Sequence, residues 1–367
     1  MVMNNIKKIN AFQVKPANQR YQVISLFSGA GGMDLGFTGN FNFLKQHYDK
    51  NPFKIVFAND IFKQAADVYE YNFNLPVERR SINDLNPKID LPQTKIDVVL
   101  GGFPCQSFSY AGKRKGLSDK RGQLYLQMIK VIKYYRPKMF IAENVDGIKN
   151  SHKDVNGNYV AKSALTTILH DFEKCHYHVQ YQLLNAADYG VPQLRKRIII
   201  IGLRSDLGKK EDIYYPQPVC DQTGIVTGHK WITAKDVIDD LWNKLDNTSI
   251  PNHTSKDVSK AKFYVNKRLQ GNRQIKATQP APTIRAEHHG NIEAHYRHYQ
   301  GYQANNPQGW RRLSVRECAR LQSFPDNFNF TASASASYKA IGNAVPPVLA
   351  WHIARSVLQT LTTVANK

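Results

Sequence analysis

The chain has 367 residues, 42% of them hydrophobic, which is enough for one large domain with a smaller inserted or appended one. Its 50 Lys and Arg residues outnumber 29 Asp and Glu residues, and the formal net charge of +21 favours a polyanionic partner, although a merely soluble basic protein would share this charge. Four unevenly spaced cysteines and no run of about 20 apolar residues disfavour a disulfide framework, structural zinc, secretion and a membrane span, so we expect a cytoplasmic protein.

The first predicted elements are a strand over Tyr21–Phe27 and a helix that begins near Met33. The turn between them, Ser28–Gly32, contains three glycines, which let a backbone approach a ligand at the N–H groups of a helix N-terminus. A dinucleotide fingerprint needs a third glycine at position 34, where Asp34 stands. This residue disfavours a nicotinamide-dependent oxidoreductase.

A second strand is predicted over Lys54–Asn59, and Asp60 follows it. An acidic side chain at the end of the second strand holds ribose hydroxyls in many open α/β sheets. The alternative role is a helix N-cap for the helix predicted over Ile61–Tyr71. We expect Asp60 to bind the ribose. A neighbouring group could still cap the helix.

A third strand is predicted over Lys95–Leu100, and Gly101–Gly102 end it, so Cys105 lies in the loop that leaves the strand. That edge of an open α/β sheet is where ligands bind. A cysteine acts as a nucleophile when it is a partly exposed thiolate near positive charge, and a basic loop follows this one. The basic residues are Lys113, Arg114, Lys115, Lys120 and Arg121. For Cys175, Cys220 and Cys318 we expect ordinary burial in the core.

Glu143 follows a strand predicted over Lys138–Ala142, after an amphipathic helix that ends near Tyr135. Its carboxyl group is therefore expected at the same sheet edge as Cys105. Near a bound base it could stay protonated and donate a proton if burial raised its pKa. The alternative is a solvated glutamate in a loop, which would have no such role.

Arg195 and Arg197 lie before an apolar strand predicted over Ile198–Leu203. The preceding segments are a helix over Ala164–Phe172 and a strand over Tyr177–Leu184. Because strand side chains alternate, the two arginines are expected on one face, where paired guanidinium groups suit a phosphate or a carbonyl oxygen.

From about Ser205 to Gly309 the alternation of strands and helices gives way to short mixed segments. Thr233–Trp242 is predicted as one helix with a capping box from Thr233 and Asp236. The stretch Thr278–Gly290 is dense in side chains that can read bases. A metal site is the disfavoured alternative; its candidate ligands would be His288, His289, His295 and His298. We expect a catalytic domain over 1–204 plus 326–367 and a recognition domain over 205–325.

The last segments are two predicted helices. Ser314 and Glu317 form a capping box that opens a helix through Leu321. Pro347 begins the final helix, which extends to about Leu361.

Taken together, these motifs resemble the DNA (cytosine-5-)-methyltransferases of bacterial restriction-modification systems. Pro-Cys-Gln, Glu-Asn-Val and Gln-x-Arg-x-Arg occur in the family's order. The matching segments are Ser25–Phe37, Phe57–Ile61, Gly101–Ser109, Glu143–Val145, Asn185–Arg197, Arg312–Phe324 and Gly342–Pro347. The resemblance implies a Rossmann-like α/β domain that uses S-adenosylmethionine, with a mixed, mostly parallel sheet, and a smaller irregular target-recognition domain.

The resemblance also implies a reaction. A methyl group passes from S-adenosylmethionine to C5 of a cytosine that is flipped out of a specific sequence in double-stranded DNA. Cys105 would attack C6, Glu143 would hold N3 and the exocyclic amine, Arg197 would contact O2, and Arg195 would assist. The attack on C6 is needed because C5 is otherwise a poor nucleophile.

Other residues carry expected contacts by the same resemblance. Phe27 would pack on the cofactor's adenine, Gly29 and Gly31 would line its methionine end, and Asp60, in place of the family's more usual glutamate, would bind the ribose. The remaining cofactor candidates are Ser28, Gly32, Ile61, Pro104, Asn343 and Val345. The adenine amine would be contacted from Arg80–Ile82 or, in a shifted register, from Asn83–Leu85. The expected DNA contacts are Ser109, Lys113, Arg121, Thr283, Ile284 and Arg285, with Gln106–Gln123 as a mobile catalytic loop.

The expected partner is double-stranded DNA, with no metal and no membrane, and the chain is expected to be a monomer that associates with the bacterial nucleoid through DNA. A cognate restriction endonuclease would act separately. Two alternatives stay open: an RNA cytosine-5 methyltransferase of the same fold, for which so long a middle region is unnecessary, and a non-catalytic DNA-binding module, which would not need Cys105, Glu143 and Arg197 together.

Overall fold

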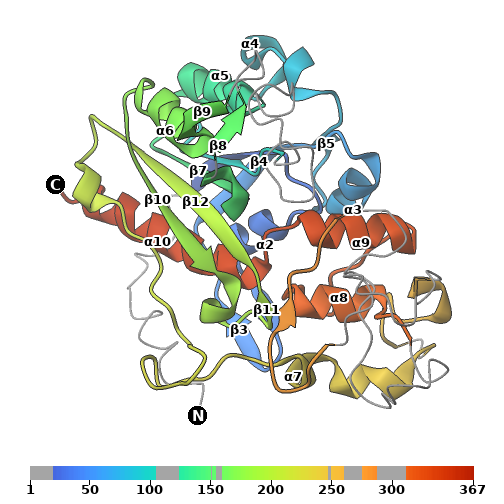
Figure 1. The fold of residues 1–367 in the computed structure, drawn as a ribbon. Helices are drawn as coiled ribbons and strands as arrows, with labels where there is room; N and C mark the ends of the chain where they lie inside the picture. Colours follow the sequence, from blue (N-terminus) through green and yellow to red (C-terminus); the bar gives the residue numbers. More distant parts are fainter. Residues whose placement is uncertain are drawn as a thin grey trace.

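A seven-stranded sheet forms the centre of the computed structural model (Figure 1). The structure describes residues 20–104, 124–149, 151–153, 159–246, 249–259, 275–286 and 311–367. The strand order is β10-β12-β7-β6-β1-β4-β5. In chain order, the bounds are β1 Tyr21–Leu26, β4 Phe53–Asn59, β5 Val77–Glu78, β6 Val98–Gly101, β7 Met139–Val145, β10 Tyr177–Asn185 and β12 Lys196–Arg204.

The strands from β7 to β5 run parallel, whereas β12 is antiparallel to both of its neighbours, β7 and β10. The expected mixed, mostly parallel sheet is therefore confirmed. Because β12 runs the other way, its first residues lie at the edge where the parallel strands end. Arg197 pairs with Val145 in this register, and Gly101 pairs with Ala142. Chain segments that are far apart in the sequence thus meet at one sheet edge.

Helices cover both faces of the sheet, as the side-chain alternation of the strands requires. On one face α5 (Tyr125–Tyr135) and α6 (Ala164–Glu173) pack against Phe140, Ile198 and Ile200. On the other face lie α2 (Gly32–Thr38), α8 (Val315–Leu321), α9 (Ala334–Asn343) and α10 (Pro347–Ala365), in a cluster with Met139, Ile199 and Ile201.

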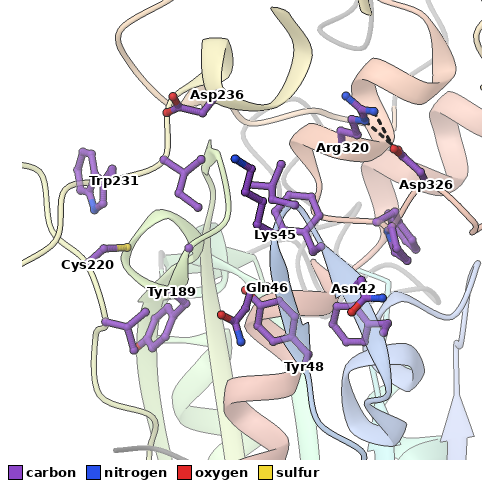
Figure 2. A pocket seen from close by; sticks show the side chains of 18 of the residues that line it. Asn42, Lys45, Gln46, Tyr48, Tyr189, Cys220, Trp231, Asp236, Arg320 and Asp326 are labelled. Carbon is purple, nitrogen blue, oxygen red and sulfur yellow. Dashed lines mark hydrogen bonds and ion pairs between the residues drawn. The ribbon is translucent and has the colours of Figure 1, made fainter. Parts of the chain in front are cut away.

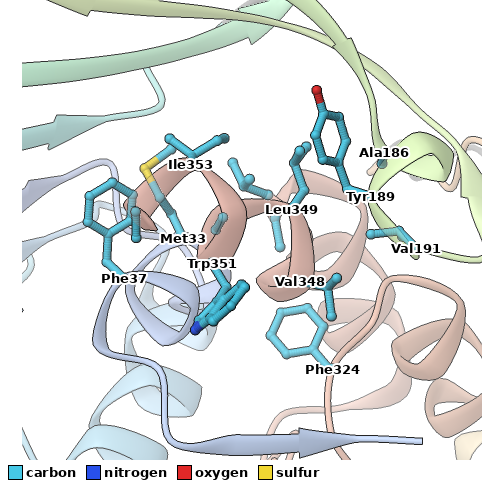
Figure 3. Packing of buried hydrophobic residues seen from close by; sticks show 14 of the residues in the cluster. Met33, Phe37, Ala186, Tyr189, Val191, Phe324, Val348, Leu349, Trp351 and Ile353 are labelled. Atoms are coloured by element: carbon cyan, nitrogen blue, oxygen red, sulfur yellow. The ribbon is translucent and has the colours of Figure 1, made fainter. Parts of the chain in front are cut away.

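The contact of α2 with α10 is close because Gly36 has no side chain. A Cβ atom there would lie 2.4 Å from Ala350 Cβ and 2.5 Å from the Pro347 carbonyl oxygen. Figure 3 shows the surrounding core, in which Met33 and Phe37 of α2 lie beside Trp351 and Ile353 of α10. The last helix in the sequence is therefore part of the core that supports the first glycine turn.

Apart from the helix α3, the remaining described elements are short. They are β2 Phe41–Phe43, β3 Gln46–Tyr48, α3 Lys63–Phe73, α4 Pro87–Asp90, β8 Ser151–Lys153, β9 Tyr159–Ser163, β11 Gln193–Leu194, α7 Ala234–Ile238 and β13 Ala281–Pro282, with 3-10 turns at Ile82–Asp84, Asp146–Lys149, Ala186–Tyr189, Lys210–Asp212, Asp239–Lys244 and Ser255–Asp257.

Two boundaries differ from the prediction in ways that matter. β7 continues through Val145, so Glu143 lies within a strand, where it pairs with Ile199, and not in a loop after one. The helix predicted over Thr233–Trp242 is α-helical only through Ile238 and then becomes a 3-10 helix. Both predicted capping boxes are confirmed, at Thr233 and at Ser314.

The predicted division into two domains stays a prediction. One hydrophobic cluster contains residues from both parts, such as Ile213, Val237 and Leu321 together with Val348. Within the described ranges, none of the helices combines the length and the apolar character that a membrane span requires.

Candidate active site

The loop that carries Cys105 begins beside Glu143. β6 ends at Gly101, and a Cβ atom at Gly102 would lie 3.6 Å from Glu143 Oε2. The Asn144 side-chain amide donates a hydrogen bond of 3.2 Å to the carbonyl oxygen of Phe103. Pro104 is the last described residue before the loop. The structure therefore directs the chain from β6 past the carboxyl group of Glu143 before Cys105 is reached.

Glu143 and Arg197 form an ion pair at this edge. The distance from Arg197 Nε to Glu143 Oε1 is 2.8 Å, and the two side chains are 12% and 11% exposed. Arg197 also donates to the carbonyl oxygen of Lys196. The Nε–H group of Arg197 does not point at the carboxylate as a hydrogen bond requires, so charge attraction in a largely desolvated pair holds the two groups together. Its remaining carboxylate oxygen and guanidinium N–H groups could meet the polar edge of a small planar ring.

The glycine turn after β1 is held by Asp60. The Gly29 N–H donates to Asp60 Oδ2 at 2.7 Å, and the Phe62 N–H donates to Oδ1 at 2.7 Å. Burial raises the pKa of Asp60 above its ordinary value, against the opposing effect of these two hydrogen bonds and of the Lys339 charge. A carboxylate can accept about four hydrogen bonds, so capacity for two hydroxyl groups is left.

The end of the sequence meets this turn. A Cβ atom at Gly32 would lie 2.3 Å from the Val345 carbonyl oxygen and 3.1 Å from Ala344 Cβ. Asn343, the last residue of α9, is exposed, and Val345 is buried. The structure thus places Ala344 and Val345 beside the glycine turn, next to Asn343.

The other described candidates for contacts with the adenine are Phe27, Ile61 and the segment around Ile82 and Asp84. Ile61 is 72% exposed, although it directly follows β4 and Asp60. Phe27 has a φ of 56°, the left-handed region that a bulky residue rarely adopts. Between the two registers considered for the adenine amine, Ile82 is buried in the core, whereas Asp84 is exposed at the end of a 3-10 turn.

The predicted DNA-contacting segment is partly internal. The Thr283 hydroxyl donates to the Leu194 carbonyl oxygen at 2.6 Å. Ile284 is 0% exposed, so the expectation that its side chain contacts DNA is wrong: the residue belongs to the core. Arg285 is partly exposed, and its backbone packs against Gly342.

Arg195 also differs from the expectation. Its side chain is buried, and its guanidinium donates to the carbonyl oxygens of Ile284, Gly342 and Ala344 at 3.0, 2.9 and 3.0 Å. Arg197 is paired with Glu143 instead. Arg195 lies between β11 and β12 and outside both, so the expected common strand face is absent, and the two arginines have different partners.

Comparisons with known proteins show the family of the chain. The family model of C-5 cytosine-specific DNA methylases matches residues 21–359. The chain belongs to this family. It is a DNA (cytosine-5-)-methyltransferase, and the oxidoreductase alternative is excluded.

Relatives of this methyltransferase cover nearly all of it. The type II methyltransferase M.NgoFVII of Neisseria gonorrhoeae is 32% identical over 98% of this chain and 90% of its own length. M.FnuDI of Fusobacterium nucleatum, also a type II methyltransferase, is 34% identical over 93% of this chain and 95% of its own. The solved structure of the Entamoeba histolytica methyltransferase EhMeth, at 16% identity, has a TM-score of 0.66 over 94% of this chain and 99% of its own, which shows the common fold.

Several predicted residues of the methyltransferase lie outside the described residues. They are Cys105, Ser109, Lys113 and Arg121, and the histidines at 288, 289, 295 and 298. Among the residues that the structure does describe, no group of three His, Cys, Asp or Glu side chains could hold a metal ion.

Sequence reasoning did not single out three amide side chains that position the site. Asn144 holds Phe103, and Gln193 and Gln322 hold the backbone around Ile284 and Ala344. Asn144 and Gln193 belong to the motifs Glu-Asn-Val and Gln-x-Arg-x-Arg, so the motifs contained the signal. Their partners are backbone groups, which no sequence motif displays.

The methyltransferase has a cavity away from this site. A cavity of about 1100 Å³ is lined by the β2–β3 hairpin, by the segment around Trp231 and by the end of α8, where Arg320 pairs with Asp326 (Figure 2). None of the described residues expected to bind cofactor, base or DNA lines it. Its connection with the site is Phe324, whose ring lies 3.1 Å from a Cβ atom placed at Gly32.

Proposed function

We propose that the methyltransferase transfers a methyl group from S-adenosylmethionine to C5 of a cytosine flipped out of double-stranded DNA, with Cys105 as the covalent nucleophile. The observation that carries the proposal is the meeting of Gly102, Glu143 and Arg197 at the sheet edge from which the Cys105 loop leaves.

The residues present fit the cofactor. Gly29 has a φ of 56°, and a Cβ atom added to it would meet no other atom within 4 Å, so the turn borders open space. Asp60 can accept from ribose hydroxyls, and the exposed Ile61 and the partly buried Phe27 offer apolar surface for a purine. Asp84 presents an exposed carboxylate that can accept from an exocyclic amine. S-adenosylmethionine would supply an electrophilic methyl group at this place.

The chemistry assigned to the protein's own groups balances as follows. The Cys105 thiolate forms a bond to C6, and the electron pair of the C5–C6 double bond becomes available at C5. Glu143, carrying a proton on one oxygen, donates it to N3 and accepts from the exocyclic amine with its other oxygen, and Arg197 donates to O2, so that both stabilise the saturated ring; the N3 proton returns to Glu143 when the double bond forms again. After C5 has gained its methyl group, the C5 proton leaves to a base, the double bond forms again, and Cys105 departs as the thiolate.

The ion pair of Glu143 and Arg197 supports these roles because it is already assembled before any base is present. Groups that need no rearrangement cost no reorganisation energy when charge develops on the ring. We therefore expect both side chains to meet the base edge from the places that the structure shows, with Glu143 taking up the proton that N3 needs.

Cys105→Ala tests the nucleophile. We expect loss of methyl transfer from labelled S-adenosylmethionine with duplex binding retained, because the substitution removes no positive charge that could bind a phosphate. Wild-type protein with duplex DNA that carries 5-fluorocytosine should form a denaturation-resistant adduct, since fluorine cannot leave as a proton does. Labelled product from the variant, or no adduct with cofactor present, would contradict the assignment.

The biological role that we propose is the modification half of a restriction-modification system, as the type II names of the relatives suggest. Bisulfite sequencing of a plasmid exposed to the protein should show conversion-resistant cytosines at one short sequence. The same assay with transcribed RNA tests the RNA alternative: methylation of RNA but not of DNA would overturn the proposed substrate.

A further inference from the structure

Three buried side chains form a polar junction, by which we mean Gln193, Arg195 and Gln322. Arg195 donates from Nη1 to the Ile284 carbonyl oxygen, and from Nη2 to the carbonyl oxygens of Gly342 and Ala344. One guanidinium group thereby joins the segment Thr283–Arg285 to the segment Gly342–Val345. These segments are separated by more than fifty residues in the sequence.

The two glutamines complete the same junction. Gln193 Oε1 accepts from the Ile284 N–H at 3.0 Å, so both backbone groups of Ile284 are held by junction side chains. Gln193 Nε2 donates to Gln322, and Gln322 Nε2 donates to the Ala344 carbonyl oxygen at 2.6 Å. The Ala344 carbonyl oxygen thus accepts two hydrogen bonds, one from Arg195 and one from Gln322.

Close backbone packing shows that the two joined segments lie next to the cofactor side of the site. A Cβ atom at Gly342 would lie 2.3 Å from the Arg285 carbonyl carbon. On the other side, a Cβ atom at Gly32 would lie 2.3 Å from the Val345 carbonyl oxygen. The order in space is therefore the predicted recognition segment, then Gly342–Val345, then the glycine turn.

The chemistry of the junction requires arginine. A guanidinium has five N–H donors in a rigid plane and can serve several carbonyl oxygens at once, whereas an ammonium is a point charge with a different hydration. Removal of such a donor leaves buried carbonyl oxygens without a partner, which is costly. These contacts use Arg195 for the backbone and turn it away from a base-contacting role.

We propose that Arg195 is a positioning residue, which holds the DNA-recognition segment and the cofactor-closing segment in one fixed arrangement through Ile284 and Gly342–Ala344. The inference rests on the proposed function where it assigns DNA recognition to Thr283–Arg285 and cofactor binding to Gly342–Val345. The hydrogen-bonded connection between the two segments does not depend on that function.

Hydrogen exchange measured by mass spectrometry tests the link without cofactor or DNA. In Arg195→Lys we expect the amides of 283–286 and of 342–345 to exchange together about tenfold faster, as the shared donor is lost. The matched control is Arg316→Lys, because Arg316 is also fully buried and donates to the carbonyl oxygens of Pro251, Pro325 and Phe328. The control should affect 251–252 and 325–328 and leave the two joined segments slow.

Gly342→Ala provides a second route should Arg195→Lys fail to fold. This variant keeps Arg195 but forces the Arg285 backbone away, so the same two segments should exchange faster. Acceleration in one segment alone, or in neither, would overturn the proposal.

Calorimetry with S-adenosylhomocysteine separates this role from a direct catalytic one. Arg195→Lys should bind the ligand and duplex DNA each about tenfold more weakly, whereas Arg197→Lys should lose methyl transfer with ligand affinity retained. Wild-type ligand affinity and slow exchange in Arg195→Lys, combined with lost methyl transfer, would place Arg195 at the base instead. If the wild-type protein binds no S-adenosylhomocysteine, the proposed function fails, and the exchange experiment still decides the junction.

Discussion

Asp34, the residue that interrupts the dinucleotide pattern, is wholly buried. It accepts hydrogen bonds from the Ser25 hydroxyl at 2.8 Å and the Tyr69 hydroxyl at 2.6 Å. Burial raises the pKa of Asp34 from 3.8 to about 6, because desolvation outweighs these two hydrogen bonds. The residue therefore connects α2 to β1 and α3, and it does so at an energetic cost when it is ionised.

The raised pKa of Asp34 predicts how the stability of the fold depends on pH. Since the folded state binds the Asp34 proton more tightly than the unfolded state, the stabilisation is complete below about pH 4 and is lost as pH rises to about 6. The loss amounts to about 3 kcal/mol. We expect Asp34→Asn, compared with wild type by urea unfolding from pH 4 to 7.5, to show a difference in unfolding free energy that changes by this amount over that window.

Asp67 is the control for this experiment. For its exposed carboxyl group, slight desolvation is outweighed by hydrogen bonds and charges from Lys63 and Arg79, so its pKa is lowered. The difference between wild type and Asp67→Asn should stay flat above about pH 4. A flat difference for Asp34→Asn as well would show that the Asp34 carboxyl group is solvated.

At the level of the elements, two glycines of the first turn and helix should differ in their effects. A Cβ atom added at Gly36 would lie 2.4 to 2.6 Å from atoms of Pro347, Ala350 and Trp351, so Gly36→Ala should lower the unfolding free energy by about 1–3 kcal/mol through overpacking. Gly29 borders open space in a left-handed conformation, so Gly29→Ala should cost about 1–2 kcal/mol in strain alone.

Ligand affinity should separate the two variants. Gly29→Ala places a methyl group at the proposed cofactor site and should weaken S-adenosylhomocysteine binding, measured by calorimetry, about tenfold or more. Gly36→Ala should bind it normally at temperatures where the variant is folded. Equal ligand affinities in the two variants would place the cofactor elsewhere.

The sequence predicts elements well where a single amphipathic pattern decides them. The strands β1, β4 and β12 and the helices α5, α6 and α10 all appear near their predicted positions. The prediction failed where a distant partner decides. α7 ends at Ile238 where Arg320 donates to the Val237 carbonyl oxygen at 3.0 Å, and that bond comes from α8, 83 residues away.

The same reason limits prediction of the site. Glu143 and Arg197 were recognised by motif, but their mutual ion pair depends on the antiparallel register of β7 and β12. Arg195 has the same residue type and a similar motif position as Arg197, yet its partners are three backbone carbonyl oxygens. Carbonyl groups are present at every residue, so no sequence pattern distinguishes the ones that meet an arginine.

For the molecule as a whole, the net charge is the property that can be counted from the sequence alone. The net charge of +21 is large for 367 residues. Some basic groups are already paired within the protein, for example Lys138 with Asp97 at 3.1 Å and Arg79 with Glu70 at 2.7 Å. A phosphate backbone could neutralise part of the remaining excess, with release of the counterions that surround DNA.

Counterion release makes the affinity for duplex DNA depend on salt, which supplies the last prediction. The logarithm of the association constant should fall linearly with the logarithm of salt concentration, by about 0.9 per phosphate contact. Arg121→Ala should therefore reduce the slope by about one if Arg121 binds a phosphate, as measured by fluorescence anisotropy at several salt concentrations. The control is Lys174→Ala, because Lys174 lies beyond α6 and is paired with Asp171 at 3.5 Å, so its loss should leave the slope unchanged. A wild-type affinity that does not change between low and physiological salt would mean that the charge excess serves another purpose than DNA binding.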